Sequence, residues 1–266
     1  MSSTEIPPVA PTLATVGGGT VQSHVADGIG RITFHHPKGN SLPGALLREL
    51  ADTVTRVSNN PLARVLQVTS GGTGPFCAGA SFDELVALTN VGDGQEFFSG
   101  FSRVILAMIR SPKFVLTRVH GRAAGGAVGL IAASDLAFAV STASAKLSEL
   151  AIGIGPFVVG PVIERKIGLS AFSAMAVDAD WRDAAWGERH GLYARLFDDA
   201  TAMDTAMETE LRKLAACNPE AMAQLKRVFW TGTESWEALL AERALMSGTM
   251  VLSDFTRSAI ANFKGR

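Results

Sequence analysis

Glu149 is a candidate for acid–base chemistry, because it lies in an otherwise apolar segment. Apolar residues and glycines follow it, and no basic residue lies nearby downstream. A carboxylate held among apolar side chains has a raised pKa, which suits general acid–base catalysis near neutral pH. A glutamate on a surface loop fits the local sequence equally well, so both interpretations stay open at this point.

Two glycine-containing loops resemble each other physically. One spans residues 76–84 and the other residues 119–127, and each joins a strand-like run to a helix start through small residues. The first backbone N–H groups of a helix have no partner within it, and small residues let a ligand approach them closely. Two such ends facing one point would form an oxyanion hole, whereas either loop alone is more often plain packing.

Other catalytic patterns are incomplete or missing. Residues 74–81 have the glycine spacing and final serine of a phosphate-binding loop, but Ala80 stands where the lysine is required. The five histidines show no metal-ligand spacing and no HExxH motif occurs, so we expect no metal site. Cys77 could act as a nucleophile, although a small buried residue in a turn is the more common role.

The segments around these loops predict alternating strands and helices. Asp27-Gly28 separates two strand-like runs, at residues 21–26 and 29–35, which indicates a tight hairpin turn. The further expected elements are helices at residues 43–57, 94–110 and 123–133 and strands at residues 63–69, 113–119 and 136–140. Such alternation is typical of an α/β layered core.

Three regions are expected along the chain. Residues 1–20 contain three prolines and three consecutive glycines, which is typical of a flexible N-terminal tail. Residues 21–200 carry the alternating elements of the core. Residues 201–266 are expected to be a helical C-terminal region.

Composition excludes several classes of protein. The 266 residues are 47% hydrophobic and 18% charged, which allows a large core and favours an oligomer that buries further surface. A net charge of −1 disfavours nucleic-acid binding. The two cysteines suit a reducing cytoplasm, and no apolar run reaches the ~20 residues of a membrane span.

Four segments, in this order along the chain, resemble motifs of the crotonase superfamily, also called the enoyl-CoA hydratase/isomerase family. They are Ile32–Leu42 with its Pro-Lys-Gly-Asn turn, Val65–Gly79, Val119–Asp135 and Glu149–Gly160. The resemblance runs from about Val21 to the end of the chain. It implies an α/β fold with a crotonase-like ββα spiral core and a C-terminal helical trimerisation region, and hence a homotrimer or a dimer of trimers.

The resemblance also implies a substrate and a site. The substrate would be an acyl-CoA thioester, with coenzyme A arriving as part of it and no further cofactor. The family's two oxyanion N–H groups match Ala80 and Gly126, and its acid–base glutamate matches Glu149. The positions that match substrate or CoA contacts are Lys38, Gly39, Ala78, Ala80, Phe82, Gly125, Gly126, Gly129 and Phe255.

One departure from the family pattern bears on the reaction. Hydratases of the family use two glutamates, and the first of these matches Gly129, which carries no carboxylate. A single carboxylate suffices to move a proton between C2 and C4, as in the single-glutamate Δ3,Δ2-enoyl-CoA isomerases of the family. We therefore expect an enzyme of hydratase/isomerase type with one glutamate as acid and base.

Two alternatives stay open from the sequence. One is another acyl-CoA reaction on the same scaffold, such as thioester hydrolysis or decarboxylation, and the other is a homologue that binds acyl-CoA without turnover. The acyl chain is also open. An apolar group that could line an acyl pocket or pack in the core comprises Ala87, Leu88, Phe97, Phe98 and Phe101.

Overall fold

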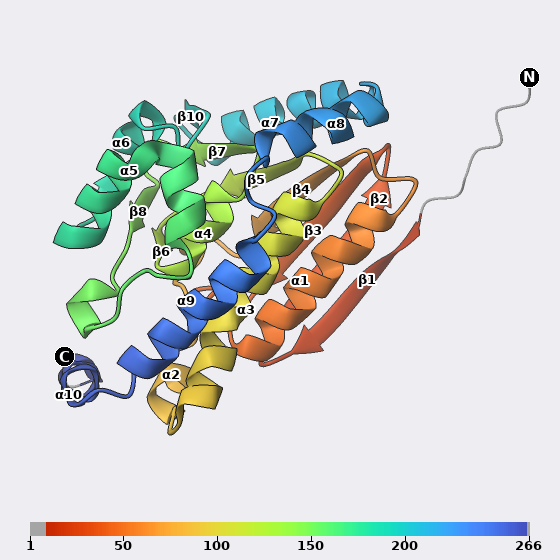
Figure 1. The fold of residues 1–266 in the computed structure, drawn as a ribbon. Coiled ribbons are helices and arrows are strands. Elements are labelled where there is room, and N and C mark those ends of the chain that lie inside the picture. Colours follow the sequence, from red (N-terminus) through yellow and green to blue (C-terminus); the bar gives the residue numbers. More distant parts are fainter. Residues whose placement is uncertain (1–8, 265–266) are drawn as a thin grey trace, which may run out of the picture.

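A seven-stranded sheet forms the centre of the protein (Figure 1). The structure is a computed structural model and describes residues 9–264. The strands, in their spatial order, are β1 (Val9–Val16), β2 (Gly19–Ala26), β3 (Ile29–His35), β4 (Val65–Ser70), β5 (Val115–Val119), β7 (Leu136–Val140) and β10 (Arg195–Phe197). Strands β1 to β3 are antiparallel, and the pairs from β3 onward are parallel.

A second, three-stranded sheet lies next to helix α4 (Gly126–Ala132). It consists of β6 (Ala123–Ala124), β8 (Ser144–Lys146) and β9 (Arg182–Asp183), in the order β6-β8-β9. Strand β8 pairs parallel with β6 and antiparallel with β9. This short sheet joins three separate segments of the chain.

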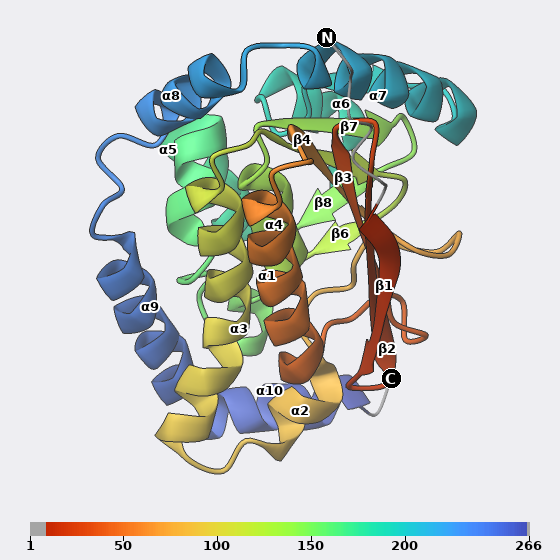
Figure 2. The ribbon, with the colours of Figure 1, turned by 90° about the vertical axis from the view of Figure 1, so that its right-hand side faces the viewer.

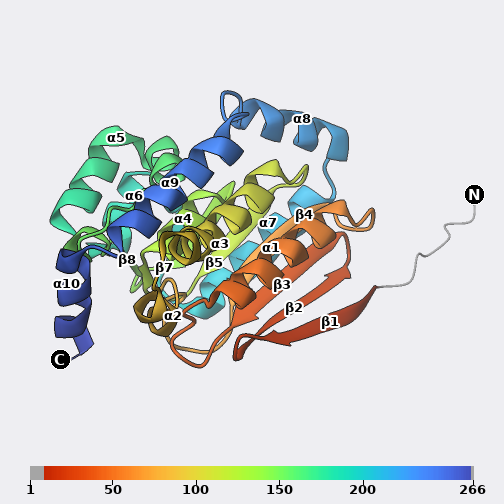
Figure 3. The same cartoon turned by 60° about the horizontal axis from the view of Figure 1, so that its bottom comes forward.

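Helices cover both faces of the large sheet. In Figure 3, α1 and α3 lie in front of the sheet, and α7 lies behind it against β3, β4, β5 and β7. Helix α9 packs along α3, and α10 lies across the end of the molecule beside a short 3-10 turn, Leu150–Ile152 (Figure 2). The helices are α1 (Gly44–Asn59), α2 (Phe82–Ala87), α3 (Val91–Arg110), α4 (Gly126–Ala132), α5 (Gly160–Asp178), α6 (Ala184–Arg189), α7 (Ala200–Ala215), α8 (Pro219–Phe229), α9 (Trp236–Met250) and α10 (Asp254–Lys264).

Local sequence explains why several of these elements form where they do. Asp27 and Gly28 both have positive φ, as the predicted two-residue hairpin turn between β2 and β3 requires. Helix α1 follows Pro43 and buries a stripe that includes Leu46, Leu50 and Val54. The predicted α/β fold class and the alternation of strands and helices are confirmed.

The N-terminal region differs from the expectation of a flexible tail over residues 1–20. Residues 9–20 belong to a hairpin in which β1 pairs with β2, and Gly17 and Gly18 supply the positive φ of its turn. Strand β1 is an edge strand, and Leu13 within it is 66% exposed. The strand is held by backbone pairing more than by side-chain burial, so its hydrophobic pattern is weak. Residues 1–8 lie outside the described residues.

A buried ion pair joins the C-terminal helices to the core. Lys226 of α8 donates hydrogen bonds from Nζ to Asp135 Oδ2 at 2.8 Å and to the carbonyls of Met108 and Lys113. Asp135 Oδ2 also accepts the backbone N–H of Val115. The side chains of Lys226 and Asp135 are only 2% and 7% exposed. The pair therefore fixes α8 against the junction between α4 and β7.

No helix among the described residues is long and apolar enough to cross a membrane.

Replacing Lys226 with methionine is expected to destabilise the protein by about 3–5 kcal/mol, because the carboxylate of Asp135 would be left buried without its cation. Lys213→Met is the matched control, since the Lys213 side chain is 68% exposed and its loss should cost less than about 1 kcal/mol. Denaturant unfolding monitored by tryptophan fluorescence measures both values. Equal stabilities for the two variants would contradict this account.

Candidate active site

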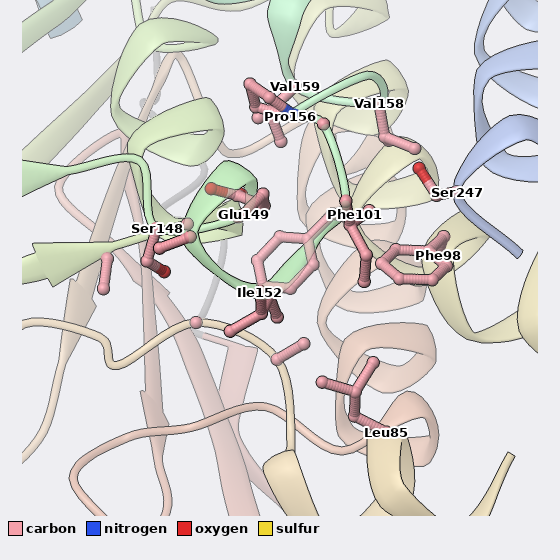
Figure 4. Close-up of a pocket in the computed structure, with 18 of the residues that line it drawn as sticks. Leu85, Phe98, Phe101, Ser148, Glu149, Ile152, Pro156, Val158, Val159 and Ser247 are labelled. Atoms are coloured by element: carbon pink, nitrogen blue, oxygen red, sulfur yellow. The ribbon is translucent and has the colours of Figure 1, made fainter. Parts of the chain in front are cut away.

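One pocket of about 800 Å³ lies where the glycine loop after β4, the start of α4 and the segment after β8 meet. Aromatic side chains of α3 form one wall, and α9 and α10 contribute Ser247, Ala259 and Asn262. Figure 4 shows Glu149 beside Ser148, with Val159 above it and Phe101 and Phe98 on the side of α3. The three residues predicted to be catalytic, Ala80, Gly126 and Glu149, all line this pocket.

Backbone pairing orients the N–H group of Ala80. Leu42 donates its N–H to the carbonyl of Gly79 at 2.8 Å, and its carbonyl accepts the N–H of Ser81 at 3.1 Å. Backbone groups alternate in direction along an extended segment, so the Ala80 N–H points away from Leu42. Within the described residues no acceptor contacts this N–H group. It is a free donor at the pocket.

The start of α4 lies against the same loop. Cys77 donates its N–H to the carbonyl of Arg122, and its own carbonyl accepts the N–H of Ala124 at 3.0 Å. Gly125 has φ 55° and donates its N–H to the carbonyl of Lys146. Helix α4 begins at the next residue, Gly126. Its N–H has no acceptor in the part of the chain that the structure describes, as is usual for a first helical turn.

Glycine at residue 126 lets the backbone approach an aromatic ring closely. A Cβ atom there would lie 2.5 Å from ring carbons of Phe101. At residue 125 a Cβ atom would lie 3.1 Å from Oε1 of Glu149, in addition to the positive φ. The carboxylate therefore lies directly against the backbone that precedes the free N–H of Gly126.

Glu149 is the only carboxylate among the described residues that line the pocket. Its Oε2 is buried and has no hydrogen-bond partner in the described chain. Burial raises the pKa of this carboxyl group from 4.5 to about 7, although backbone N–H groups of residues 148 and 149 oppose the shift. The raised pKa expected from the apolar sequence context is thus confirmed, and the group can exchange a proton near neutral pH.

The position that lacks the second carboxylate is filled by apolar side chains. A Cβ atom on Gly129 would lie 2.6 Å from Cγ1 of Val159 and 3.2 Å from Cδ1 of Ile105. Gly129 itself is buried and does not line the pocket, whereas Val159 does. The pocket wall near Glu149 therefore presents a methyl-bearing side chain instead of an acid.

The remaining predicted substrate contacts divide into two groups. Ala78, Phe82 and Gly125 line the pocket. Lys38 and Gly39 lie outside its lining: Lys38 pairs with Asp83, and Gly39 accepts the N–H of Ala78 at 3.1 Å. These two residues thus contact the glycine loop and the start of α2.

Phe255 also lies outside the main pocket. It is 69% exposed and borders a small surface hollow with Asp254, Ser258 and other residues of α10. Its ring is also the nearest side chain to Gly153, where a Cβ atom would lie 2.5 Å away. All of these substrate and CoA contacts stay predictions.

The turn that contains Lys38 and Gly39 supports the glycine loop after β4 through Asn40. Asn40 is 2% exposed, and its Oδ1 accepts the N–H of His36 at 2.9 Å. Its Nδ2 donates to the carbonyls of Gly71 and Pro75. The turn thereby fixes both ends of the segment that leads to Ala80.

Sequence reasoning identified some of the residues that line the pocket and missed others. Phe97, Phe98 and Phe101 line the pocket, whereas Ala87 and Leu88, proposed with them, do not. Val159, Lys146 and Trp181 line it without having been singled out. Their positions depend on how distant segments pack, so no local signal identifies them. Cys77 is fully buried, and burial raises the pKa of its thiol to about 12, which disfavours a nucleophilic role.

Comparisons with known proteins agree with this architecture. A family model described as enoyl-CoA hydratase/isomerase matches residues 24–263. The chain is 28% identical over 204 residues to carnitinyl-CoA dehydratase of Escherichia coli (strain K12), covering 76% of this chain and 77% of that protein. It is 26% identical over 195 residues to 1,2-epoxyphenylacetyl-CoA isomerase of the same strain, covering 71% and 73%.

Solved structures show the same fold. An enoyl-CoA hydratase from Bacillus halodurans superimposes with a TM-score of 0.83 at 17% identity, over 91% of this chain and 99% of that chain. An enoyl-CoA hydratase from Mycobacterium avium subsp. paratuberculosis gives a TM-score of 0.81 at 20% identity, over 94% and 100%. At these identities the likeness concerns the fold alone.

The raised pKa of Glu149 predicts a pH-dependent stability difference. Because its pKa is 4.5 when unfolded and about 7 when folded, the wild type loses up to about 3 kcal/mol of stability as pH rises through this window. Glu149→Gln cannot ionise, so its stability relative to the wild type should rise by that amount between about pH 4.5 and 8. Urea unfolding across this range measures it. Glu242→Gln, an exposed change in α9, should follow the wild type. Parallel curves for all three proteins would refute the assignment.

The packing around Gly129 predicts that replacing this glycine with alanine lowers the stability of the protein, although alanine normally favours a helix. In a helix, glycine to alanine is normally stabilising by up to about 1 kcal/mol. Here Gly129→Ala is expected to destabilise by about 1–3 kcal/mol, because the new methyl group would overlap Val159. The second substitution Val159→Ala should relieve most of that cost, and a double-mutant cycle of unfolding free energies measures the coupling. Additive effects would show that the two residues do not compete for space.

Proposed function

The chain belongs to the enoyl-CoA hydratase/isomerase family of enzymes, and from this premise we propose that it shifts a double bond within an enoyl-CoA thioester, with Glu149 as its single acid and base. One observation carries the proposal: a lone carboxylate with an unpartnered buried oxygen shares a pocket with two unpartnered backbone N–H groups. An acyl-CoA thioester is the plausible substrate for this family.

The proposed reaction begins at the thioester oxygen. The N–H groups of Ala80 and Gly126 bind this oxygen and stabilise the negative charge that it gains as an enolate forms. Losing one such donor typically costs about 2.7–4 kcal/mol of activation free energy, so a pair can supply much of the catalysis. The start of α4 adds the favourable end of its short dipole at Gly126.

Glu149 moves the proton. Its carboxylate removes a proton from C2 of a 3-enoyl thioester, and the electron pair of that C–H bond delocalises onto the thioester oxygen. The carboxylic acid then returns the proton to C4, which leaves a double bond between C2 and C3. Nothing is added or lost, so the step needs no water and no cofactor beyond the coenzyme A of the substrate. A pKa of about 7 suits a group that must both accept and donate this proton.

The apolar wall at Val159 favours double-bond migration over hydration. Hydration needs a water molecule to be activated and oriented, which is easier with two carboxylates. Here Val159 and Ile105 occupy the space beside Gly129, so no second acid faces Glu149 from α4.

Assembly as a homotrimer or a dimer of trimers belongs to the same proposal. Large apolar side chains are exposed on α5 and α8: Leu169 and Val177 are 64% and 70% exposed, and Val228 is 66% exposed. Exposed apolar patches of this kind mark surfaces that associate with other protein. Further copies of the chain would cover them.

Glu149→Gln is expected to reduce kcat for conversion of a 3-enoyl-CoA to the conjugated 2-enoyl-CoA by a hundredfold or more, with the affinity for the thioester retained. For the wild type, kcat/KM should rise with pH and level off above about 7, because the carboxylate is the base. The absorbance of the conjugated thioester measures turnover, and Glu242→Gln serves as the control. Unchanged turnover in Glu149→Gln, or a 3-hydroxyacyl product from the wild type, would refute the proposal.

A further inference from the structure

The pocket has a positively charged end that the proposed proton transfer does not use. Among the described residues that line it, Lys146 is the only cation, and it lies on the short sheet β6-β8-β9. The opposite end of the pocket, toward α2 and α3, is lined by Leu85, Phe97 and Phe98 and carries no charge. The pocket is therefore polarised from one end to the other.

Strand register gathers the charged end on one face of this sheet. Lys146 pairs with Ala124, and Ala145 pairs with Arg182. Side chains alternate between faces, so Arg122, Ala124, Lys146 and the residue opposite it, Trp181, share one face. Ala124, Lys146 and Trp181 all line the pocket, whereas Arg122 is exposed and lies outside the lining, next to the Trp181 ring.

The indole ring of Trp181 lies close to two cations. The Cζ atom of Arg122 lies 5.5 Å from the ring centroid, and Nζ of Lys146 lies 6.0 Å from it. Neither side chain has a carboxylate within 4.0 Å in the described part of the chain. Two cations near one ring repel each other, and the ring offsets only part of that repulsion. An anion bound close to both side chains would offset this repulsion.

This charged end is connected directly to the site of the proposed reaction. The carbonyl of Lys146 accepts the N–H of Gly125 at 2.8 Å, and Gly125 precedes the free N–H of Gly126. Lys146 also lies three residues before Glu149 on the same segment. A group held at Ala80 and Gly126 would thus have the acid on one side and the two cations farther along the same short sheet.

We propose that the acyl group of the substrate carries a carboxylate, which Lys146 and Arg122 bind beside the Trp181 ring. The proposal rests on the proposed function, since it places a thioester at Ala80 and Gly126. The substrate class is then a CoA thioester of a dicarboxylic enoyl acid. Guanidinium and ammonium groups both form strong charge-assisted hydrogen bonds to carboxylates.

The test compares two 3-enoyl-CoA thioesters of equal length that differ only at the far end, a free carboxylate or its methyl ester. The wild type should prefer the carboxylate by about tenfold or more in kcat/KM, because a hydrogen bond to a charged group is worth about that factor. In Lys146→Gln and in Arg122→Gln the ratio of the two kcat/KM values should fall by about tenfold, mainly through KM. Lys213→Gln, an exposed change in α7, should keep the wild-type ratio.

Binding measurements keep the test independent of turnover. Calorimetric titration of Glu149→Gln with the two thioesters should show the same preference in Kd, and the Lys146→Gln/Glu149→Gln double variant should lose it. Equal affinity for both thioesters overturns the carboxylate proposal and leaves the proposed function intact if either is isomerised. Absence of isomerisation with a retained carboxylate preference overturns the proposed function alone.

The phosphates of coenzyme A are the other source of negative charge. Titration of the wild type and Lys146→Gln with free coenzyme A, which carries the phosphates but no acyl carboxylate, separates the two sources. If Lys146→Gln weakens binding of free coenzyme A as much as binding of the carboxylate thioester, the cations bind phosphate and the proposal is overturned. Unchanged affinity for free coenzyme A supports it.

Discussion

Backbone pairing between two loops is the constraint on which the rest of the site depends. The glycine loop pairs with Leu42 on one side, through residues 79 and 81, and with the segment before α4 on the other, through Cys77. These hydrogen bonds use the neighbouring backbone groups and leave the N–H groups of Ala80 and Gly126 without acceptors in the described chain. Unpartnered N–H groups are costly when buried, so a pocket that exposes them to a ligand is the arrangement in which they can persist.

The same pocket holds a carboxylate at a cost to stability. Glu149 lies against Gly125 with a buried Oε2, and its raised pKa expresses the free energy required to ionise it there. Val159 and Ile105 pack against Gly129 and keep this part of the wall apolar. Burial in this apolar surrounding is the main cause of the raised pKa of Glu149.

Segments from the whole length of the chain complete the pocket. Asn40 fixes the loop that leads to Ala80, and α9 contributes Ser247, which is 1% exposed. The buried pair of Lys226 and Asp135 holds α8, which precedes α9 in the chain, against the core. The short sheet also brings Lys146 and the neighbouring Trp181 to the pocket. The shape of the pocket therefore depends on segments that lie before residue 45, in the middle of the chain and after residue 235.

Much of the fold and part of the site could be predicted from local sequence. Proline before α1 and the Asp27-Gly28 turn act on neighbouring residues, so their effects are visible in a short window. Strand β1 escaped prediction because an exposed edge strand is stabilised by its partner's backbone and has little side-chain pattern of its own. The sequence likewise indicated Glu149, since an acid among apolar residues is a local feature.

The sequence by itself determined which residues have the chemistry: one acid in an apolar segment, small residues at two helix starts, and a glycine where a second acid would stand. Only the tertiary structure decided which residues meet. The filling of the space beside Gly129 by Val159, and the meeting of Arg122 and Lys146 at the ring of Trp181, depend on contacts between segments more than 20 residues apart. Such contacts follow from packing and strand register, which no local pattern in the sequence contains.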